Sequence, residues 1–306
     1  IQQRMKLSKR GLLRIIGLSP IAASTKINLL HSTELMERRI IPSSGKLLPV
    51  IGLGTSRVFD VKPNKALLEI RKQILEILLF HGGTMVDTSP MYGMAEEITG
   101  IISRELNHKD PLFLATKVWT DGNNEGVTQI NSSFEKMNAS MIDLIQIHNL
   151  RDWKTHIKTL RALKEKGRIN YIGITHYKAS AFEAMEDIIR KEPIDFAQFN
   201  YSLGEREAEK RLLPLCQDKG IATIINRPYM RGKLFKEVKD KKLPNWAKEY
   251  NINSWAQYFL KFILANPAVT NIIPATSKPK NMIDNSKGGY TPIPGISLQK
   301  KMLEIK

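Results

Sequence analysis

An alternation of short apolar segments with longer amphipathic segments constrains the fold of this chain most strongly. Counting from Val50, eight apolar segments of strand length each precede a segment with apolar residues at helical spacing. The pairs are 50–55 with 65–80, 84–87 with 96–106, 112–117 with 126–138, 143–148 with 153–166, 171–175 with 179–190, 196–200 with 205–219, 221–226 with 252–265, and 271–274 with 280–286. Strands that alternate with helices pair in parallel through right-handed crossovers. Eight such units in about 250 residues predict a (β/α)8 TIM barrel.

The main alternative for this pattern is an open, doubly wound sheet. Such a sheet commonly carries a Gly-x-Gly-x-x-Gly turn after its first strand. Gly52 and Gly54 supply the first two glycines, but Arg57 stands in the third position. The strand segments are also apolar throughout, which is typical of parallel strands covered on both faces. We therefore favour the barrel.

The segments before the barrel predict two further features. Residues 39–49 contain two short apolar runs around Ser43-Ser44-Gly45, which predicts an N-terminal β-hairpin. Residues 1–35 are predicted to form a basic, targeting-like leader, and residues 36–306 one barrel domain. The first 33 residues hold six Lys or Arg and no acidic residue. Residues 8–14, SKRGLLR, resemble a twin-arginine export motif with Lys9 in place of the first Arg.

The leader has an open alternative, which is a frayed basic N-terminus without a targeting role. The protein would be periplasmic if the leader functions and cytoplasmic otherwise. The apolar stretch after residue 14 is too short to span a bilayer, and no other stretch approaches that length. We therefore expect no transmembrane span.

Charge and cysteine content narrow the classes of function. The net charge of +17 suits a solvated basic surface, an aid to a phosphate-bearing cofactor, or nucleic-acid binding. Because no nucleic-acid-binding motif accompanies the charge, we expect no nucleic-acid partner. The single cysteine, Cys216, excludes a disulfide framework. The spacing of the six histidines gives no zinc pattern, so no metal is expected.

Four residues that can donate or accept protons lie, in order, at or just after the ends of successive strand segments. Asp87 ends one segment and Tyr92 lies five residues on, while Lys117 and His148 end the next two segments. The C-terminal ends of barrel strands share one face, where active sites lie. A phenol with a pKa near 10 donates protons poorly, and a nearby ammonium lowers that pKa. The set suits carbonyl reduction, with the hydride supplied by a cofactor.

This arrangement resembles the catalytic tetrad of the aldo-keto reductase family, and the resemblance covers about residues 39–290. Within the family, the chain resembles bacterial members that carry a twin-arginine leader. The segments 226–229, 254–257 and 273–277 are similar to that group. The resemblance implies that Tyr92 is the general acid, that Lys117 and Asp87 tune it, and that His148 orients the carbonyl.

The resemblance also implies a nicotinamide cofactor bound without a Rossmann motif. Its expected binding residues are Thr55, Asp87, Thr175, His176, Gln198, Asn226, Arg227, Gly232, Thr276, Ser277, Lys278 and Asn285. Members that prefer NADP place a Lys after the last strand's proline and an Arg farther along, where this chain has Ala275 and Asn281. Lys278 remains as a cation for a phosphate, so NADP(H) is favoured and NAD(H) stays possible.

The expected activity is NADP(H)-dependent reduction of an aldehyde or ketone, a small-molecule carbonyl substrate. The substrate pocket is expected to include Met91, Trp119, Tyr177 and Tyr229. One alternative is a barrel that binds the cofactor but senses redox state or regulates, with little turnover. Another is a barrel that binds anionic ligands through its charge without redox chemistry. The oligomeric state is left open by the sequence.

Overall fold

The computed structural model describes residues 36–106 and 112–305. The chain divides after Thr33 into two units, and the described residues belong to the second, Glu34–Lys306. The predicted leader, residues 1–35, lies outside the described residues. Within the described part of the chain, no helix is both long enough and apolar enough to cross a membrane.

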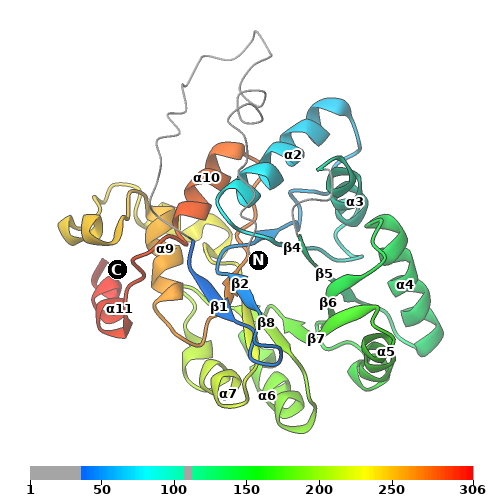
Figure 1. The fold of residues 1–306 in the computed structure, drawn as a ribbon. Helices are drawn as coiled ribbons and strands as arrows, with labels where there is room; N and C mark the ends of the chain where they lie inside the picture. The colour runs from blue at the N-terminus through cyan, green and yellow to red at the C-terminus, as the bar shows by residue number, and fades with distance from the viewer. Residues whose placement is uncertain (1–35, 107–111, 306) are drawn as a thin grey trace, which may run out of the picture. The chain divides into compact units, whose positions relative to one another are not determined.

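Eight parallel strands form a nearly closed barrel, as predicted (Figure 1). They are β3 (Leu53–Gly54), β4 (Met85–Asp87), β5 (Phe113–Val118), β6 (Ile142–His148), β7 (Ile169–His176), β8 (Phe196–Asn200), β9 (Ala222–Asn226) and β10 (Asn271–Ile272). Bridges from Ile51 to Ile272 and from Gly54 to Ala275 bring the first and last strands together. A Cβ on Gly54 would lie 2.8 Å from the carbonyl oxygen of Ile273, so this close approach requires glycine.

The helices surround the strands (Figure 1). They are α2 (Lys65–Phe80), α3 (Ala95–Glu105), α4 (Asn123–Lys136), α5 (Trp153–Glu165), α6 (Phe182–Lys191), α7 (Leu212–Asp218), α8 (Lys233–Glu237), α9 (Trp255–Leu264), α10 (Pro279–Lys287) and α11 (Ile296–Met302). Short 3-10 turns are η1 (Ala179–Ala181), η2 (Glu207–Glu209), η3 (Met230–Gly232), η4 (Asn245–Tyr250) and η5 (Leu303–Ile305). Sequence periodicity did not predict α8 or α11.

One expected helix, over residues 205–219, was wrong. The chain forms η2 and then α7, which begins only at Leu212. Pro214 lies in the first turn of α7, where its missing N–H costs nothing. In a helix that began at residue 205 the same proline would be interior, would lose a backbone hydrogen bond and would clash with the preceding turn.

The predicted hairpin is present, formed by β1 (Arg38–Ile40) and β2 (Leu47–Pro49). Ile41 and Leu48 are buried in one apolar cluster with Met85, Ala115, Leu144, Tyr171, Phe196, Ala222, Ile224 and Ile273. Most of these barrel residues stand near the start of their strands. The hairpin therefore fills the end of the barrel opposite the C-terminal ends of the strands.

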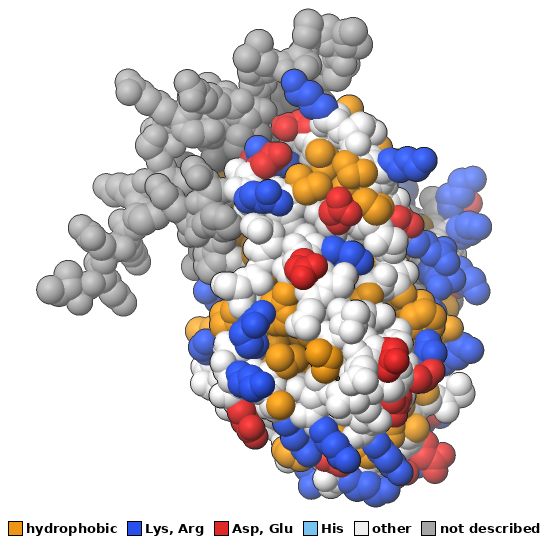
Figure 2. All heavy atoms as spheres, turned by 90° about the vertical axis from the view of Figure 1, so that its right-hand side faces the viewer, with side chains coloured by type: hydrophobic (Ala, Val, Ile, Leu, Met, Phe, Trp, Pro, Cys, Tyr) orange, Lys and Arg blue, Asp and Glu red, His pale blue; other side chains and the backbone are white. Residues whose placement is uncertain are grey.

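On one face of the molecule the basic residues are spread out. On the face in Figure 2, Lys and Arg side chains are scattered, with Asp and Glu among them. This distribution is typical of a solvated surface rather than of a single electrostatic patch.

Candidate active site

The residues predicted to be catalytic meet at the C-terminal ends of three neighbouring strands. Asp87 is the last residue of β4, Lys117 lies in β5, and His148 is the last residue of β6. The register pairs Lys117 with Gln146 across the β5–β6 ladder. Tyr92 lies on the turn after β4, where its N–H donates to the carbonyl of Ser89 at 3.0 Å.

The carboxylate of Asp87 is held by three donors. Lys117 Nζ donates to Oδ2 at 2.6 Å, and both partners are almost fully buried. Gln146 Nε2 and Gln198 Nε2 donate to Oδ1 at 3.0 and 2.9 Å. Gln198 Oε1 in turn accepts from the Thr175 hydroxyl at 3.2 Å. The carboxylate, and through it the ammonium of Lys117, is therefore fixed in position.

The phenol of Tyr92 lies beside this ion pair. Lys117 Nζ is 5.0 Å from the centre of the Tyr92 ring. Burial raises the pKa of Tyr92 above its ordinary value of 10.0, while the charge of Lys117 opposes that shift. Burial also opposes the charge of Lys117, but Asp87 and Tyr92 outweigh it, so the pKa of Lys117 is raised. Lys117 thus acts on the pKa of Tyr92 in the predicted direction, while burial has the larger and opposite effect.

His148 faces Tyr92 as a neutral ring. The two ring centres are 5.8 Å apart, with the planes at 89°. Burial, followed by the charge of Lys117, lowers the pKa of His148 to about 3. Its Nδ1 lies 3.1 Å from Ser89 Oγ, and the same Oγ accepts from the Met91 N–H at 3.3 Å. At neutral pH the ring therefore has one N–H to donate.

A cavity of about 950 Å³ opens beside these groups. It is within the size range of cofactor and ligand sites. Most of the predicted site residues line it, namely Thr55, Asp87, Met91, Tyr92, His148, Thr175, Tyr177, Gln198, Asn226, Arg227, Tyr229, Gly232, Thr276 and Asn285. Lys117 lies behind Asp87 and does not reach the cavity wall.

Four other predicted residues also lie outside the cavity lining. The N–H of Trp119 donates to Gln129 Oε1 at 2.6 Å, and its ring lies under the guanidinium of Arg151. His176 Nδ1 accepts from the Lys178 N–H at 3.1 Å, which turns the ring toward its own loop. Ser277 and Lys278 are exposed on the segment that leads into α10.

Tyr229, which was expected beside the substrate, does line the cavity, and its hydroxyl donates to Asn285 Oδ1 at 2.6 Å.

The structure adds residues that the sequence did not single out for a role. Gln146 holds Asp87, and its position two residues before His148 on β6 places both side chains on the same face of the strand. Ser89 contacts His148. Arg57 and Asn149 line the cavity from loops and Arg231 from the 3-10 turn η3, where residue spacing does not predict side-chain direction.

The cavity residues fit a nicotinamide dinucleotide. Asn149 Oδ1 and Asn226 Oδ1 are buried and accept no hydrogen bond from the described residues. Unpaired buried acceptors favour a ligand that carries N–H groups, such as a carboxamide. Arg231 and Gly232 also line the cavity, and the guanidinium of Arg231 suits a phosphate.

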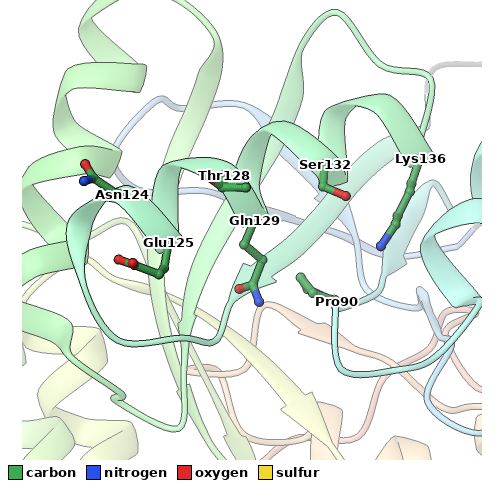
Figure 3. A pocket seen from close by; sticks show the side chains of 7 residues that line it. All are labelled: Pro90, Asn124, Glu125, Thr128, Gln129, Ser132 and Lys136. Carbon is green, nitrogen blue, oxygen red and sulfur yellow. The ribbon is translucent and has the colours of Figure 1, made fainter.

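A second hollow, of about 490 Å³, lies outside the site (Figure 3). It is lined by Pro90 and by residues of the outer part of α4, and it contains none of the catalytic groups. Both ends of the Gln129 amide bond the backbone of Trp119. Gln129 therefore serves the local structure, and the hollow does not extend the active site.

No group of three or more His, Cys, Asp or Glu side chains among residues 36–106 and 112–305 is placed to hold a metal ion.

Known proteins are similar to this chain in sequence or in fold. The chain is 28% identical to the aldo-keto reductase YhdN of Bacillus subtilis over 65% of its own length and 64% of the relative's. It is 27% identical to the uncharacterized oxidoreductase YtbE of the same species, over 83% and 88% of the two chains. An aldo-keto reductase from Klebsiella pneumoniae, solved in complex with NADPH, superposes with a TM-score of 0.71 at 19% identity, covering 90% of this chain and 95% of that one.

The family model for the aldo/keto reductase family matches residues 50–294, which include every strand of the barrel. The chain therefore belongs to the aldo/keto reductase family.

Proposed function

We propose that this protein reduces aldehyde or ketone carbonyls with NADP(H) as the favoured cofactor, and that Tyr92 is the general acid. One observation carries the proposal. Two proton donors that are neutral at physiological pH, Tyr92 and His148, line one cavity, with the Asp87–Lys117 ion pair directly behind them.

The bound reduced nicotinamide supplies the hydride for the carbonyl carbon. As the carbonyl oxygen gains negative charge, Tyr92 donates its phenolic proton to that oxygen. The phenolate left behind is stabilised by the ammonium of Lys117, which Asp87 and the carbonyl of Thr88 hold at 2.6 and 2.7 Å. Because the pKa of Tyr92 is raised, the phenol is already protonated at neutral pH.

His148 orients the carbonyl oxygen. Its neutral ring donates one hydrogen bond into the cavity without adding a positive charge beside Lys117. Substrate contacts are proposed for Met91 and Tyr177, which line the cavity at the same end as Tyr92. Trp119 lies outside the cavity lining, and the hydroxyl of Tyr229, which lines the cavity, donates to Asn285, so neither is proposed as a substrate contact.

The cofactor is proposed to lie along the rest of the cavity. Thr55, Thr175 and Asn226 would hold the nicotinamide end, and Thr276 and Asn285 the adenine end. Ala275 and Asn281 leave the adenine end without the basic pair expected for a 2′-phosphate, so NAD(H) remains a possible second cofactor. The NADPH bound to the Klebsiella relative supports NADP(H) as the favoured one.

The test is NADPH oxidation with a panel of aldehydes and ketones, comparing the wild type with Tyr92→Phe. We expect Tyr92→Phe to lower kcat by about 10²–10⁴-fold, the usual contribution of a general acid. The dissociation constant for NADPH, measured by tryptophan fluorescence quenching, should stay unchanged. Tyr171→Phe is the matched control, because its hydroxyl bonds Ser44 at the opposite end of the barrel.

Equal rates in the wild type and Tyr92→Phe, with tight NADPH binding in both, would contradict the catalytic assignment. That result would support the alternative of a cofactor-binding barrel that senses redox state or regulates.

The twin-arginine-like sequence of residues 8–14 supports a further proposal, that residues 1–35 are a leader for export of the 36–306 domain. Fusing residues 1–35 to a reporter that is active only outside the cytoplasm tests it, with Arg10→Lys as the variant expected to abolish export. A reporter signal equal in both would contradict the leader.

A further inference from the structure

The cavity carries positive charge from three arginines, and the carboxylate of Glu205 acts on one of them, Arg227, without forming an ion pair. Arg57, Arg227 and Arg231 line it, and none of the three forms an ion pair within the described part of the chain. Unpaired guanidinium groups around one cavity favour an anionic ligand.

The acidic residues of the cavity bond other groups. Asp60 accepts from the Met94 N–H at 3.1 Å, and Asp87 accepts from Lys117. Asp284 accepts from Ser254 and, at 2.7 Å, from Gln257. None of these carboxylates forms an ion pair with a cavity arginine, so the arginines remain available to a ligand. The phosphates of the cofactor would pair with some of these arginines. The position of each arginine in the cavity indicates whether it faces the cofactor or the substrate.

Arg227 stands at the catalytic end of the cavity. It follows β9 directly, and its guanidinium lies 4.2 Å from the centre of the Tyr177 ring. The Tyr177 ring stacks on His176 with centres 5.5 Å apart and planes at 15°. His176 is in turn held by the Lys178 N–H. This column of three side chains fixes the guanidinium and leaves its N–H edge free to bind.

Two further observations indicate that the position is specialised. The backbone of Arg227 is left-handed, with φ of 53°, a conformation that costs a non-glycine residue energy and is found at ligand sites. Its charge also reaches the catalytic phenol, since it is one of the groups that act to lower the pKa of Tyr92. Arg227, Tyr177 and Tyr92 all line the same cavity, so one substrate can contact both Arg227 and Tyr92.

We propose that Arg227 binds an anionic group, a carboxylate or a phosphate, carried by the carbonyl substrate. This inference rests on the proposed function, because it names the class of substrate that Tyr92 reduces. A planar guanidinium pairs with a carboxylate or phosphate through two parallel hydrogen bonds, and its partial burial strengthens them. His176, predicted to contact the cofactor, instead supports the platform on which Arg227 lies.

Matched substrates separate this role from cofactor binding. The probes are 4-carboxybenzaldehyde and 4-formylphenyl phosphate, with 4-nitrobenzaldehyde as a neutral analogue of the first. Each is assayed at saturating NADPH with the wild type, Arg227→Met and Arg227→Lys. Arg104→Met is the control, because it removes one exposed positive charge on α3 without touching the cavity.

We expect Arg227→Met to lower kcat/KM for an anionic aldehyde by about 10–100-fold, mainly through KM, which is the usual effect of losing a charged hydrogen-bonded pair. The value for 4-nitrobenzaldehyde should change less than about threefold. Arg227→Lys should restore part of the preference, and Arg104→Met should leave it intact. The two anionic probes also show whether carboxylate or phosphate fits better.

Three results would overturn the inference. The wild type could show no preference for the anionic aldehydes over the neutral one. Arg227→Met could lower the rates of all three substrates alike, or weaken NADPH binding, and Arg227 would then serve the cofactor. Arg104→Met could reduce the preference as much as Arg227→Met, which would assign it to overall charge.

A binding measurement keeps the inference testable if no aldehyde is turned over. Calorimetry then compares 4-carboxybenzyl alcohol with 4-nitrobenzyl alcohol, each added to the protein saturated with NADP⁺. Tighter binding of the carboxylate, lost in Arg227→Met, would support the anion site even though the reductase proposal had failed. Equal binding of both alcohols would reject the site.

Discussion

The hydroxyl of Ser89 determines which nitrogen of His148 carries the proton. Ser89 is fully buried, and its oxygen already accepts from the Met91 N–H. A buried hydroxyl needs an acceptor for its own hydrogen, and His148 Nδ1 is the acceptor within reach among the described residues. Because the ring is neutral, a bare Nδ1 leaves the proton on Nε2. Ser89 is therefore a positioning residue for the donor that faces the substrate.

Ser89→Ala should lower kcat by about tenfold, since losing one net hydrogen bond costs about 1–1.5 kcal/mol. KM for NADPH should not change. Nitrogen NMR of labelled protein should show His148 as the Nε2–H tautomer in the wild type and a mixture in Ser89→Ala. Ser103→Ala, which removes a hydroxyl bonded within α3, is the control. A wild-type spectrum with the proton on Nδ1 would reject this account.

The positions of the proposed catalytic residues could be predicted from the sequence because Asp87, Lys117 and His148 lie at or near the ends of strands and Tyr92 lies on the turn that follows one. Asp87 and His148 end strands whose apolar segments are easily recognised. Trp119 and His176 also follow or end strands, yet neither lines the cavity. Trp119 is bonded by Gln129 of helix α4 and His176 by the backbone of Lys178, and the spacing of residues in the sequence does not reveal these contacts.

At the scale of elements, helices were predicted where apolar periodicity was unbroken. Helix α2, for example, spans Lys65–Phe80 as expected, and Asn64 Oδ1 accepts from the Leu67 N–H at its start. The helix expected at residues 205–219 failed because Pro214 sets where α7 can begin. Packing between neighbouring helices adds constraints that periodicity does not reveal, and Gly100 of α3 is one of them.

Gly100→Ala should destabilise the protein, although alanine favours helices by about 1 kcal/mol over glycine. A Cβ at this position would lie 2.1 Å from the carbonyl oxygen of Lys136, at the end of α4. Overpacking of this kind costs about 1–3 kcal/mol or more, so the free energy of unfolding in urea should fall. Arg104→Ala, exposed on the same helix, should change it by about 0.5 kcal/mol or less. A more stable Gly100→Ala variant would show that α3 and α4 can separate.

For the whole molecule, the barrel has a catalytic end and a closed end. The proposed catalytic residues and the cavity lie at the C-terminal ends of the strands, and the hairpin of β1 and β2 fills the other end. The sequence predicted the number of units and the hairpin, because both are local patterns. It did not predict the closing contacts from Ile51 and Gly54 to the last strand, since these join residues more than 200 positions apart.

The closed end can be tested with two adjacent leucines of the hairpin. Leu48 is 2% exposed and packs with the first residues of the strands, whereas Leu47 is 58% exposed. Leu48→Ala should lower the free energy of unfolding by about 2–4 kcal/mol, because it leaves a cavity at the base of the barrel. Leu47→Ala should change it by about 0.5 kcal/mol or less. Urea denaturation followed by tryptophan fluorescence measures both, and kcat of the folded Leu48→Ala protein should stay near that of the wild type. Equal stability of the two variants would mean that the packing of the barrel does not depend on the hairpin. A large loss of kcat in folded Leu48→Ala would mean that the closed end is coupled to the proposed catalytic end.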